Sequence, residues 1–160
     1  MELYLLRHAH AGDPVAWDGP DDQRPLSEKG EQQADRLGRF LAGIGFRADA
    51  VITSPKVRAA QTARIVAGHL ELQVTTDERL AGALSPVALD AVLRDAGGPE
   101  RPVVVGHDPD FTELVAVLCD AARVPMRKGA LARIDIAGRL GPGAGTLRWL
   151  VPPDVLRPEH

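Results

Sequence analysis

The sequence contains a single cysteine, so the chain cannot form an internal disulfide bond. Cys119 ends the apolar run LVAVLC and has no basic cluster beside it. We therefore expect a buried, inert thiol rather than a catalytic one. The chain has 160 residues, of which 44% are hydrophobic and 26% are charged, which indicates one folded globular domain over residues 1–160.

Long apolar runs are also missing. The first apolar run stops at Arg7, and no stretch approaches the roughly 20 apolar residues that span a bilayer. We therefore expect a soluble, cytoplasmic protein that does not contact membranes. Neither sign of charge is in large excess, because 19 basic residues face 22 acidic ones for a net charge of −3. That balance argues against a general nucleic-acid binder, but it leaves room for a local cationic pocket.

Short apolar runs typical of strands alternate along the chain with segments whose apolar residues have helical spacing. A helix begins at Glu28 after the capping residue Ser27, and another is predicted to have Pro55 at its first position and to run to about Gly68. The pattern predicts a three-layer α/β/α sandwich with a mostly parallel central sheet and an antiparallel pair near the C-terminus. The expected strands are Leu3–Leu6, Ala50–Thr53, Gln73–Thr75, Pro102–Gly106, Leu131–Ile136 and Thr146–Val151, and the remaining helices are Pro86–Asp95 and Asp110–Leu118.

Unusual polar residues follow three of these strands. Arg7 and His8 come after the first strand, Arg58 comes shortly after the second, and His107 follows the strand PVVVG. Ligands of open α/β sheets bind outside the carboxyl ends of the strands, so these side chains are expected to meet at one edge. Guanidinium groups match phosphate oxygens, and an imidazole is a nucleophile or a donor, so the sequence predicts a phosphate site.

Four segments resemble the motifs of one known superfamily. The run LYLLRHAHAGD resembles the signature of the histidine phosphatase (phosphoglycerate mutase-like) superfamily, in which the first strand ends in Arg-His-Gly. The segments RPLSEKG, SPKVRAAQTA and VVVGHDPDF agree with that family in order and spacing. The short chain, Ala9 in place of glycine, and the ending LRWLVPPDVL are similar to the small SixA-type phosphohistidine phosphatases.

The resemblance implies a role for each of the four residues. His8 is expected to be the nucleophile that becomes phosphorylated, Arg7 and Arg58 to bind the transferring group, and His107 to donate to one of its oxygens. Phosphoryl transfer depends on placed charge, which these groups supply without a metal or another cofactor. The two arginines should lower the pKa of His8, and a backbone carbonyl should fix its tautomer. Water then hydrolyses the phosphohistidine intermediate.

Three further residues have two interpretations each. Arg24 either touches the phosphate or only anchors a helix start. Ser54 caps its helix, contacts the phosphate through a backbone group, or does both. His10 shares a face with His8 if the chain stays extended, so it either lines the pocket or is a polar loop residue. The remaining histidines, His69 and His160, are expected to be incidental.

The general acid is the least defined part of the prediction. Glu78, Asp13 and Asp108 are candidates, but none lies in a pattern that matches the carboxylate motif of larger family members. A phosphoramidate needs less protonation of its leaving group than a phosphoester does. The stretch between Arg58 and His107 is also too short for a covering insertion, so we expect an open pocket. The expected partner is a phosphohistidine-bearing protein, and the alternative is a small phosphorylated molecule.

Three rival interpretations of the same residues are possible. The pairs His8 with His10 and His107 with Asp108 resemble a metal-binding set, although two nearby arginines disfavour a divalent cation. A non-catalytic phosphate-binding module would keep the fold without turnover. A nucleotide-binding loop at Gly141–Gly145 is disfavoured because no helix follows it.

Overall fold

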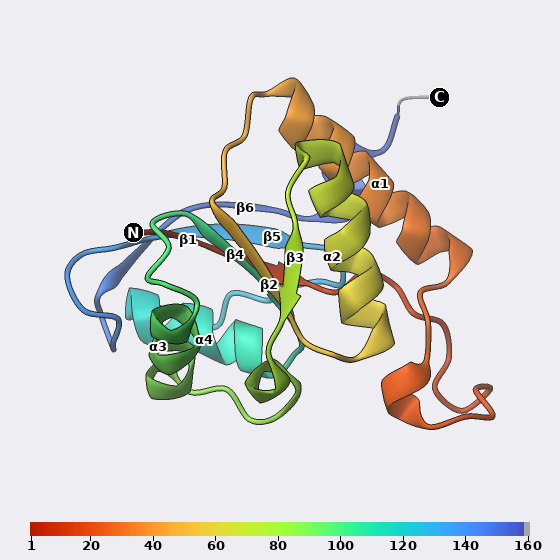
Figure 1. Ribbon diagram of the computed structural model, residues 1–160, viewed down its shortest axis with the longest axis horizontal. Helices are drawn as coiled ribbons and strands as arrows, with labels where there is room; N and C mark the ends of the chain where they lie inside the picture. Colours follow the sequence, from red (N-terminus) through yellow and green to blue (C-terminus); the bar gives the residue numbers. More distant parts are fainter. Residues whose placement is uncertain (159–160) are drawn as a thin grey trace.

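The computed structural model describes residues 1–158, and His160, which was expected to be incidental, lies outside the described residues. Within residues 1–158, six strands form one sheet in the order β3-β2-β4-β1-β5-β6 (Figure 1). Their bounds are β1 Glu2–Arg7, β2 Ala50–Thr53, β3 Val74–Thr76, β4 Pro102–Gly106, β5 Leu131–Ile136 and β6 Gly145–Val151.

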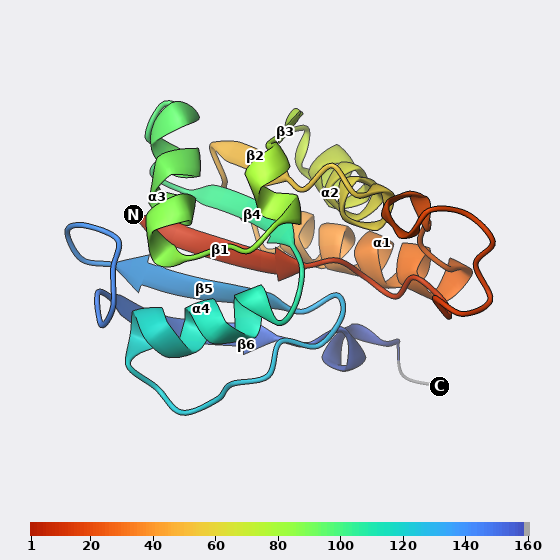
Figure 2. The same cartoon turned by 90° about the horizontal axis from the view of Figure 1, so that it is seen from below.

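Helices cover both faces of this sheet. Figures 1 and 2 show α1 and α2 together on one face, and α3 and α4 on the other. None of the helices in residues 1–158 has both the length and the apolar character needed to cross a membrane. The α-helices are α1 Glu28–Gly43, α2 Val57–Leu70, α3 Pro86–Asp95 and α4 Asp110–Cys119, and the short 3₁₀ helices are η1 Asp21–Gln23, η2 Glu78–Ala81 and η3 Pro153–Leu156.

The sheet separates two apolar layers, which explains why the first strand is apolar from Leu3 to Leu6. In β1, Leu3 and Leu5 pack among residues of α3 and α4, whereas Tyr4 and Leu6 pack among residues of α1 and α2. Successive side chains of a strand point to opposite faces, so a strand covered on both sides is apolar at every position. The predicted three-layer sandwich is confirmed.

The strand directions also agree with the prediction. β4 is parallel to both β1 and β2, and β3 is parallel to β2. β5 is antiparallel to β1 and to β6, so the closing antiparallel pair is confirmed. Its place beside β1 puts the segment before β5 next to the end of β1.

One helix start was predicted wrongly. Helix α2 begins at Val57 with Lys56 as its N-cap, and Pro55 is therefore not its first residue. The hydroxyl of Ser54 accepts a hydrogen bond from the Lys56 backbone N–H at 3.2 Å, which holds Ser54–Lys56 in a turn. The other boundaries lie within about two residues of the prediction. The predicted cap of α1 is confirmed, because the Ser27 hydroxyl accepts from the Gly30 N–H at 3.1 Å.

The topology positions the candidate site. β1, β4 and β2 are adjacent parallel strands, and Arg7 pairs with Gly106 while Thr53 pairs with Val105. Their carboxyl ends therefore meet at one edge of the sheet, from which the chain leaves into loops (Figure 2).

Candidate active site

His8 is held by its backbone at the end of β1. Its N–H donates to the Gly106 carbonyl at 3.0 Å, and its own carbonyl accepts from the Gly129 N–H at 3.0 Å. The ring atom Nδ1 lies 2.8 Å from the Ala9 carbonyl oxygen. A carbonyl can only accept, so Nδ1 carries the ring proton and Nε2 keeps a free lone pair. The predicted hydrogen bond to a backbone carbonyl is confirmed.

The environment of His8 favours the neutral ring. Burial lowers the pKa of His8 to about 4, the hydrogen bond to Ala9 opposes that change, and the charges of Arg58 and Arg7 add to the lowering. The predicted lowering of the His8 pKa by the two arginines is present, but it is the smaller effect. Burial is the larger cause, because a charged ring that is only 6% exposed loses most of its hydration. At neutral pH the ring is therefore uncharged and nucleophilic.

Arg7 is held by the loop before β5 and by Asp108 in the turn before α4. Its Nη1 donates to the Met126 carbonyl at 2.7 Å and lies 3.5 Å from Oδ2 of Asp108. Asp108 in turn accepts from the backbone N–H and the hydroxyl of Thr112, at 2.9 Å and 2.7 Å. These are the contacts of an acceptor, and through them Asp108 is held beside Arg7.

Arg58 is held by a residue that the sequence analysis did not single out. Its Nη1 donates to the Asp21 carbonyl at 2.9 Å, and its Nη2 donates to the Asp21 carboxylate at 3.1 Å. The same carboxylate accepts from Nε of Arg24 at 3.2 Å. The Nη1 of Arg24 donates to the carbonyls of Ala11 and Gly12. These contacts favour the anchoring interpretation of Arg24, which ties the loop after β1 to η1.

Ser54 contacts His107 across the ends of β2 and β4. The Ser54 hydroxyl oxygen lies 2.7 Å from Nε2 of His107, and it already accepts a hydrogen bond from the Lys56 N–H. When the Ser54 hydroxyl donates its hydrogen to Nε2, the ring proton of His107 lies on Nδ1. Burial, assisted by the charges of His8, Lys56, Arg58 and Arg7, lowers the pKa of His107 to about 3.

Three buried donors around His8 are left without partners. Among residues 1–158, Nε of Arg7, Nε of Arg58 and Nδ1 of His107 are buried nitrogen atoms that make no hydrogen bond. The rings of His8 and His107 have centroids 5.2 Å apart, and both arginines lower the pKa values of both rings in addition to the larger effect of burial. A buried unsatisfied donor costs about 1–3 kcal/mol, so this arrangement suits an anion that offers several oxygen acceptors.

The other predicted residues lie away from this cluster or serve the scaffold. Nδ1 of His10 lies 2.6 Å from the Ser27 hydroxyl, so its ring contacts the cap of α1. Asp13 is exposed, and its carboxylate accepts from the Val15 N–H in a turn. Glu78 is exposed on η2. Both carboxylates are exposed, and the role of Asp13 or Glu78 as the general acid stays a prediction.

Thr62 was missed although it lies inside a quoted motif. Its hydroxyl donates to the Arg58 carbonyl at 2.7 Å and accepts from the Ala9 N–H at 3.1 Å. One side chain thus connects the helix that carries Arg58 to the residue after the nucleophile. The spacing of four residues from Arg58, on one helix face, was the available signal.

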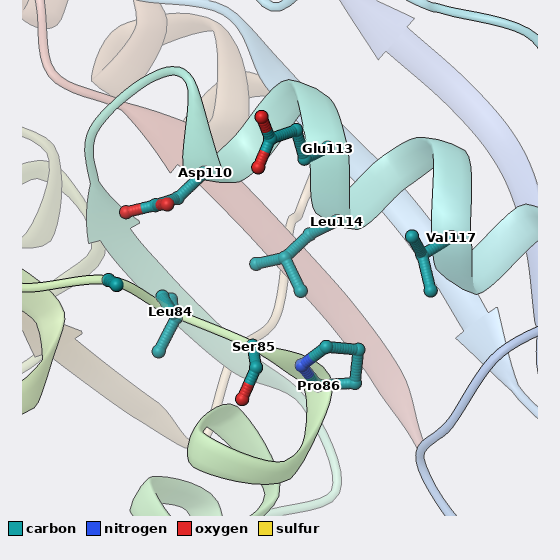
Figure 3. Close-up of a pocket in the computed structure, with 8 residues that line it drawn as sticks. Leu84, Ser85, Pro86, Asp110, Glu113, Leu114 and Val117 are labelled. Carbon is teal, nitrogen blue, oxygen red and sulfur yellow. The ribbon is translucent and has the colours of Figure 1, made fainter.

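A separate groove of about 440 Å³ lies between the start of α3 and helix α4 (Figure 3). Figure 3 shows the carboxylates of Asp110 and Glu113 at its α4 side, opposite Leu84–Pro86. These carboxylates would repel a phosphate, so the groove does not compete with the histidine cluster for that ligand. Among residues 1–158, no three His, Cys, Asp or Glu side chains lie close enough together to hold a metal ion.

Comparison with known proteins agrees with the geometry. Residues 3–82 match the histidine phosphatase superfamily (branch 1). The chain belongs to the histidine phosphatase superfamily. It is therefore a phosphatase of the histidine-nucleophile type.

Relatives of this histidine phosphatase include small and larger enzymes. The phosphohistidine phosphatase SixA of Escherichia coli is 27% identical over 98% of this chain and 97% of its own length. A solved structure of the protein histidine phosphatase SixA complexed with tungstate has a TM-score of 0.84 and 26% identity, covering 98% of this chain and 100% of that one. An 8-oxo-(d)GTP phosphatase of Mycolicibacterium smegmatis is 28% identical over 95% of this chain, which spans 48% of that relative.

Proposed function

We propose that this histidine phosphatase removes the phosphoryl group from phosphohistidine on a partner protein, with His8 as the nucleophile. The observation that carries the proposal is the set of unpartnered buried donors on Arg7, Arg58 and His107, placed around a ring whose Nε2 is free. The similarity to SixA, one structure of which contains the tetrahedral oxyanion tungstate, supports the same assignment.

In the first step, Nε2 of His8 attacks the phosphorus atom. A bond from Nε2 to phosphorus forms as the bond from phosphorus to the substrate nitrogen breaks, and that nitrogen keeps the electron pair. Arg7, Arg58 and His107 donate to the equatorial oxygens and stabilise the charge on them. The His8 ring becomes positively charged, and the hydrogen bond from its Nδ1 to the Ala9 carbonyl strengthens.

In the second step, water attacks the phosphorus atom of phosphorylated His8. The bond from phosphorus to Nε2 breaks and returns the electron pair to the ring, and the water oxygen becomes part of inorganic phosphate. The water proton leaves with the phosphate or passes to solvent. The enzyme is then neutral at His8 again, ready for another cycle.

The leaving group favours phosphohistidine over a phosphoester. A phosphorylated imidazole whose second nitrogen carries a proton departs as a neutral ring, so it needs no acid from the enzyme. An alkoxide leaving group does need one. The three carboxylates proposed as acids are either exposed (Asp13 and Glu78) or engaged with Thr112 and Arg7 (Asp108).

A second candidate is hydrolysis of small phosphorylated molecules. The similarity to the 8-oxo-(d)GTP phosphatase favours it, since nearly the whole chain aligns with part of that enzyme. The two candidates share the phosphorylated His8 intermediate and differ in what delivers the phosphoryl group. The choice between them is therefore a comparison of substrates.

The test combines trapping with a substrate comparison. Wild-type protein quenched during turnover of a ³²P-labelled phosphohistidine peptide should retain label, and His8→Ala should retain less than about one hundredth as much. His69→Ala is the matched control, because His69 pairs with Asp35 outside the site. The kcat/KM for the peptide should exceed that for small phosphoesters and should survive exhaustive chelation. Label on His8→Ala would contradict the nucleophile, binding without turnover would indicate a phosphate-binding module, and a preference for small phosphoesters would favour the second candidate.

A further inference from the structure

We propose that Lys128 forms an anion subsite beside the phosphoryl position, which binds an acidic side chain flanking the phosphohistidine of the partner protein. The inference rests on the proposed function and names a feature of its substrate. No motif in the sequence analysis included Lys128, because it lies in the short segment between α4 and β5.

Backbone hydrogen bonds hold the residue after Lys128 against the nucleophile. The N–H of the following residue, Gly129, donates to the carbonyls of both Arg7 and His8, at 3.1 Å and 3.0 Å. The Arg7 side chain donates to the Met126 carbonyl on the other side of Lys128. The segment from Met126 to Gly129 is thus fixed to the end of β1, and Lys128 has a defined place at the site.

The cations nearer the centre of the site each have a carboxylate. Arg58 and Arg24 share Asp21, and Arg7 lies near Asp108. Lys56 also has an acidic neighbour, since its ammonium group lies 3.8 Å from Asp22.

Lys128 differs from these cations. Within residues 1–158, its ammonium group makes no ion pair and no hydrogen bond, although the residue is half-buried. Burial lowers the pKa of Lys128, and the charges of Arg7, Arg24, Arg58 and Lys29 lower it further. A half-buried ammonium group among other cations is stabilised when an anion binds beside it.

The anion is a second group rather than the transferred phosphoryl. Burial is the main cause of the lowered pKa of His8, and Lys128 contributes less to it than Arg58 and Arg7 do. For His10, burial again dominates, but Lys128 is the largest of the charged contributors. Among the charged groups, Arg7 lowers the pKa of Lys128 most, so the Lys128 charge acts beside Arg7 as well as toward His10. The two arginines act on His8 more strongly than Lys128 does, and we assign the transferred phosphoryl group to them.

A carboxylate of the partner protein fits this position. The transferred phosphoryl group carries about −1.5 to −2 charges, which Arg7 and Arg58 already match. A flanking aspartate or glutamate side chain brings one more negative charge a few ångströms away, at the place of the unpaired ammonium group. Because of this pairing, the enzyme should select substrates in which an acidic residue flanks the phosphohistidine.

The test uses two phosphohistidine peptides that differ only in having Glu or Gln on both sides of the phosphohistidine, together with phosphorylated imidazole. Wild-type protein should prefer the Glu peptide about tenfold in kcat/KM, mainly through a lower KM. Lys128→Met should remove most of that preference, and Lys128→Arg should keep it. Lys29→Met is the matched control, because Lys29 is an exposed lysine of the same cluster; it should preserve the ratio.

The remaining outcomes separate the two proposals. Cleavage of both peptides at equal rates by the wild-type protein overturns the Lys128 subsite and leaves the proposed function intact. An equal loss of kcat by Lys128→Met on all three substrates also overturns it, since Lys128 would then act on the transferred group. Wild-type protein that cleaves neither peptide contradicts the proposed function and this inference with it. A small phosphorylated molecule that carries a second phosphate serves as a further substrate. If Lys128→Met lowers kcat/KM for that molecule and leaves the Glu-to-Gln peptide ratio unchanged, the anion is a second phosphate, and the choice of a protein carboxylate is overturned.

Discussion

We infer that the hydroxyl group of Ser54 sets which ring nitrogen of His107 carries the proton. Ser54 is fully buried, its oxygen accepts from the Lys56 N–H, and its own hydrogen is free to donate to Nε2 of His107. Nδ1 is thereby kept as a donor, and it is one of the buried atoms without a partner. We therefore propose that the Ser54 side chain positions a donor, and the predicted phosphate contact through its backbone stays a prediction.

Replacing Ser54 tests this role. Ser54→Ala removes the group that fixes the tautomer, so kcat should fall about three- to tenfold, the equivalent of one neutral hydrogen bond. The ¹⁵N chemical shifts of His107 should change from a single Nδ1–H form to a mixture of tautomers. Ser85→Ala is the control, because it removes a hydroxyl of the same kind that caps α3 away from the site. An unchanged His107 spectrum in Ser54→Ala would rule out the assignment.

At the scale of elements, the site depends on how closely α1 approaches the loop after β1. Gly30 lies in the first turn of α1, and a Cβ atom placed there would come within 1.9 Å of the His10 carbonyl oxygen. The Ser27 N–H donates to that same carbonyl at 3.0 Å. Glycine is therefore required in the segment RPLSEKG for a steric reason, and the segment holds the loop that continues from His8.

Two glycine substitutions in α1 should have opposite effects. Gly30→Ala forces the helix start away from His10, so we expect a loss of about 1–3 kcal/mol in the free energy of unfolding and a lower kcat. Gly43→Ala ends the same helix with open space around the new methyl group, so it should be neutral or stabilise by up to about 1 kcal/mol. Urea titration of both variants measures the difference. Equal stability of the two would show that the close approach has no energetic consequence.

At the scale of the whole molecule, the site lowers stability in acid. His8 and His107 have pKa values of about 4 and about 3 in the folded protein, against 6.5 for an ordinary histidine. Above pH 6.5 both rings are neutral in the folded and unfolded states, and no penalty exists. Below it the unfolded chain binds protons that the folded protein does not, so stability falls as the pH falls from 6.5 toward about 4.

This pH dependence gives a measurable slope. Each histidine that stays neutral should contribute at most about 1.4 kcal/mol per pH unit between pH 6.5 and its folded pKa, and His107 less because it is more exposed. His8→Asn should flatten the dependence of the unfolding free energy on pH in this window. The same curves between pH 7 and 9 serve as the reference, since neither ring titrates there. A slope that His8→Asn leaves unaltered would contradict the neutral buried ring.

Much of this protein was readable from the sequence because the signals were local. Runs of apolar residues gave the strands, cap residues gave the helix starts, and the polar residues after three strands gave Arg7, His8, Arg58 and His107. The rule that ligands bind outside the carboxyl ends of parallel strands then predicted that these side chains meet at one edge of the sheet. The motifs also identified the superfamily.

The tertiary structure alone decided which atoms contact each other between segments distant in sequence. Asp21 holds Arg58, Ser54 contacts His107, and the N–H of Gly129, the residue after Lys128, donates to the carbonyl of His8, although no spacing along the chain relates these pairs. The same packing directed Arg24 to loop carbonyls and the ring of His10 to Ser27. Local sequence fixes backbone preferences and residue chemistry, whereas the partner of a flexible polar side chain depends on which segments the folded core brings together.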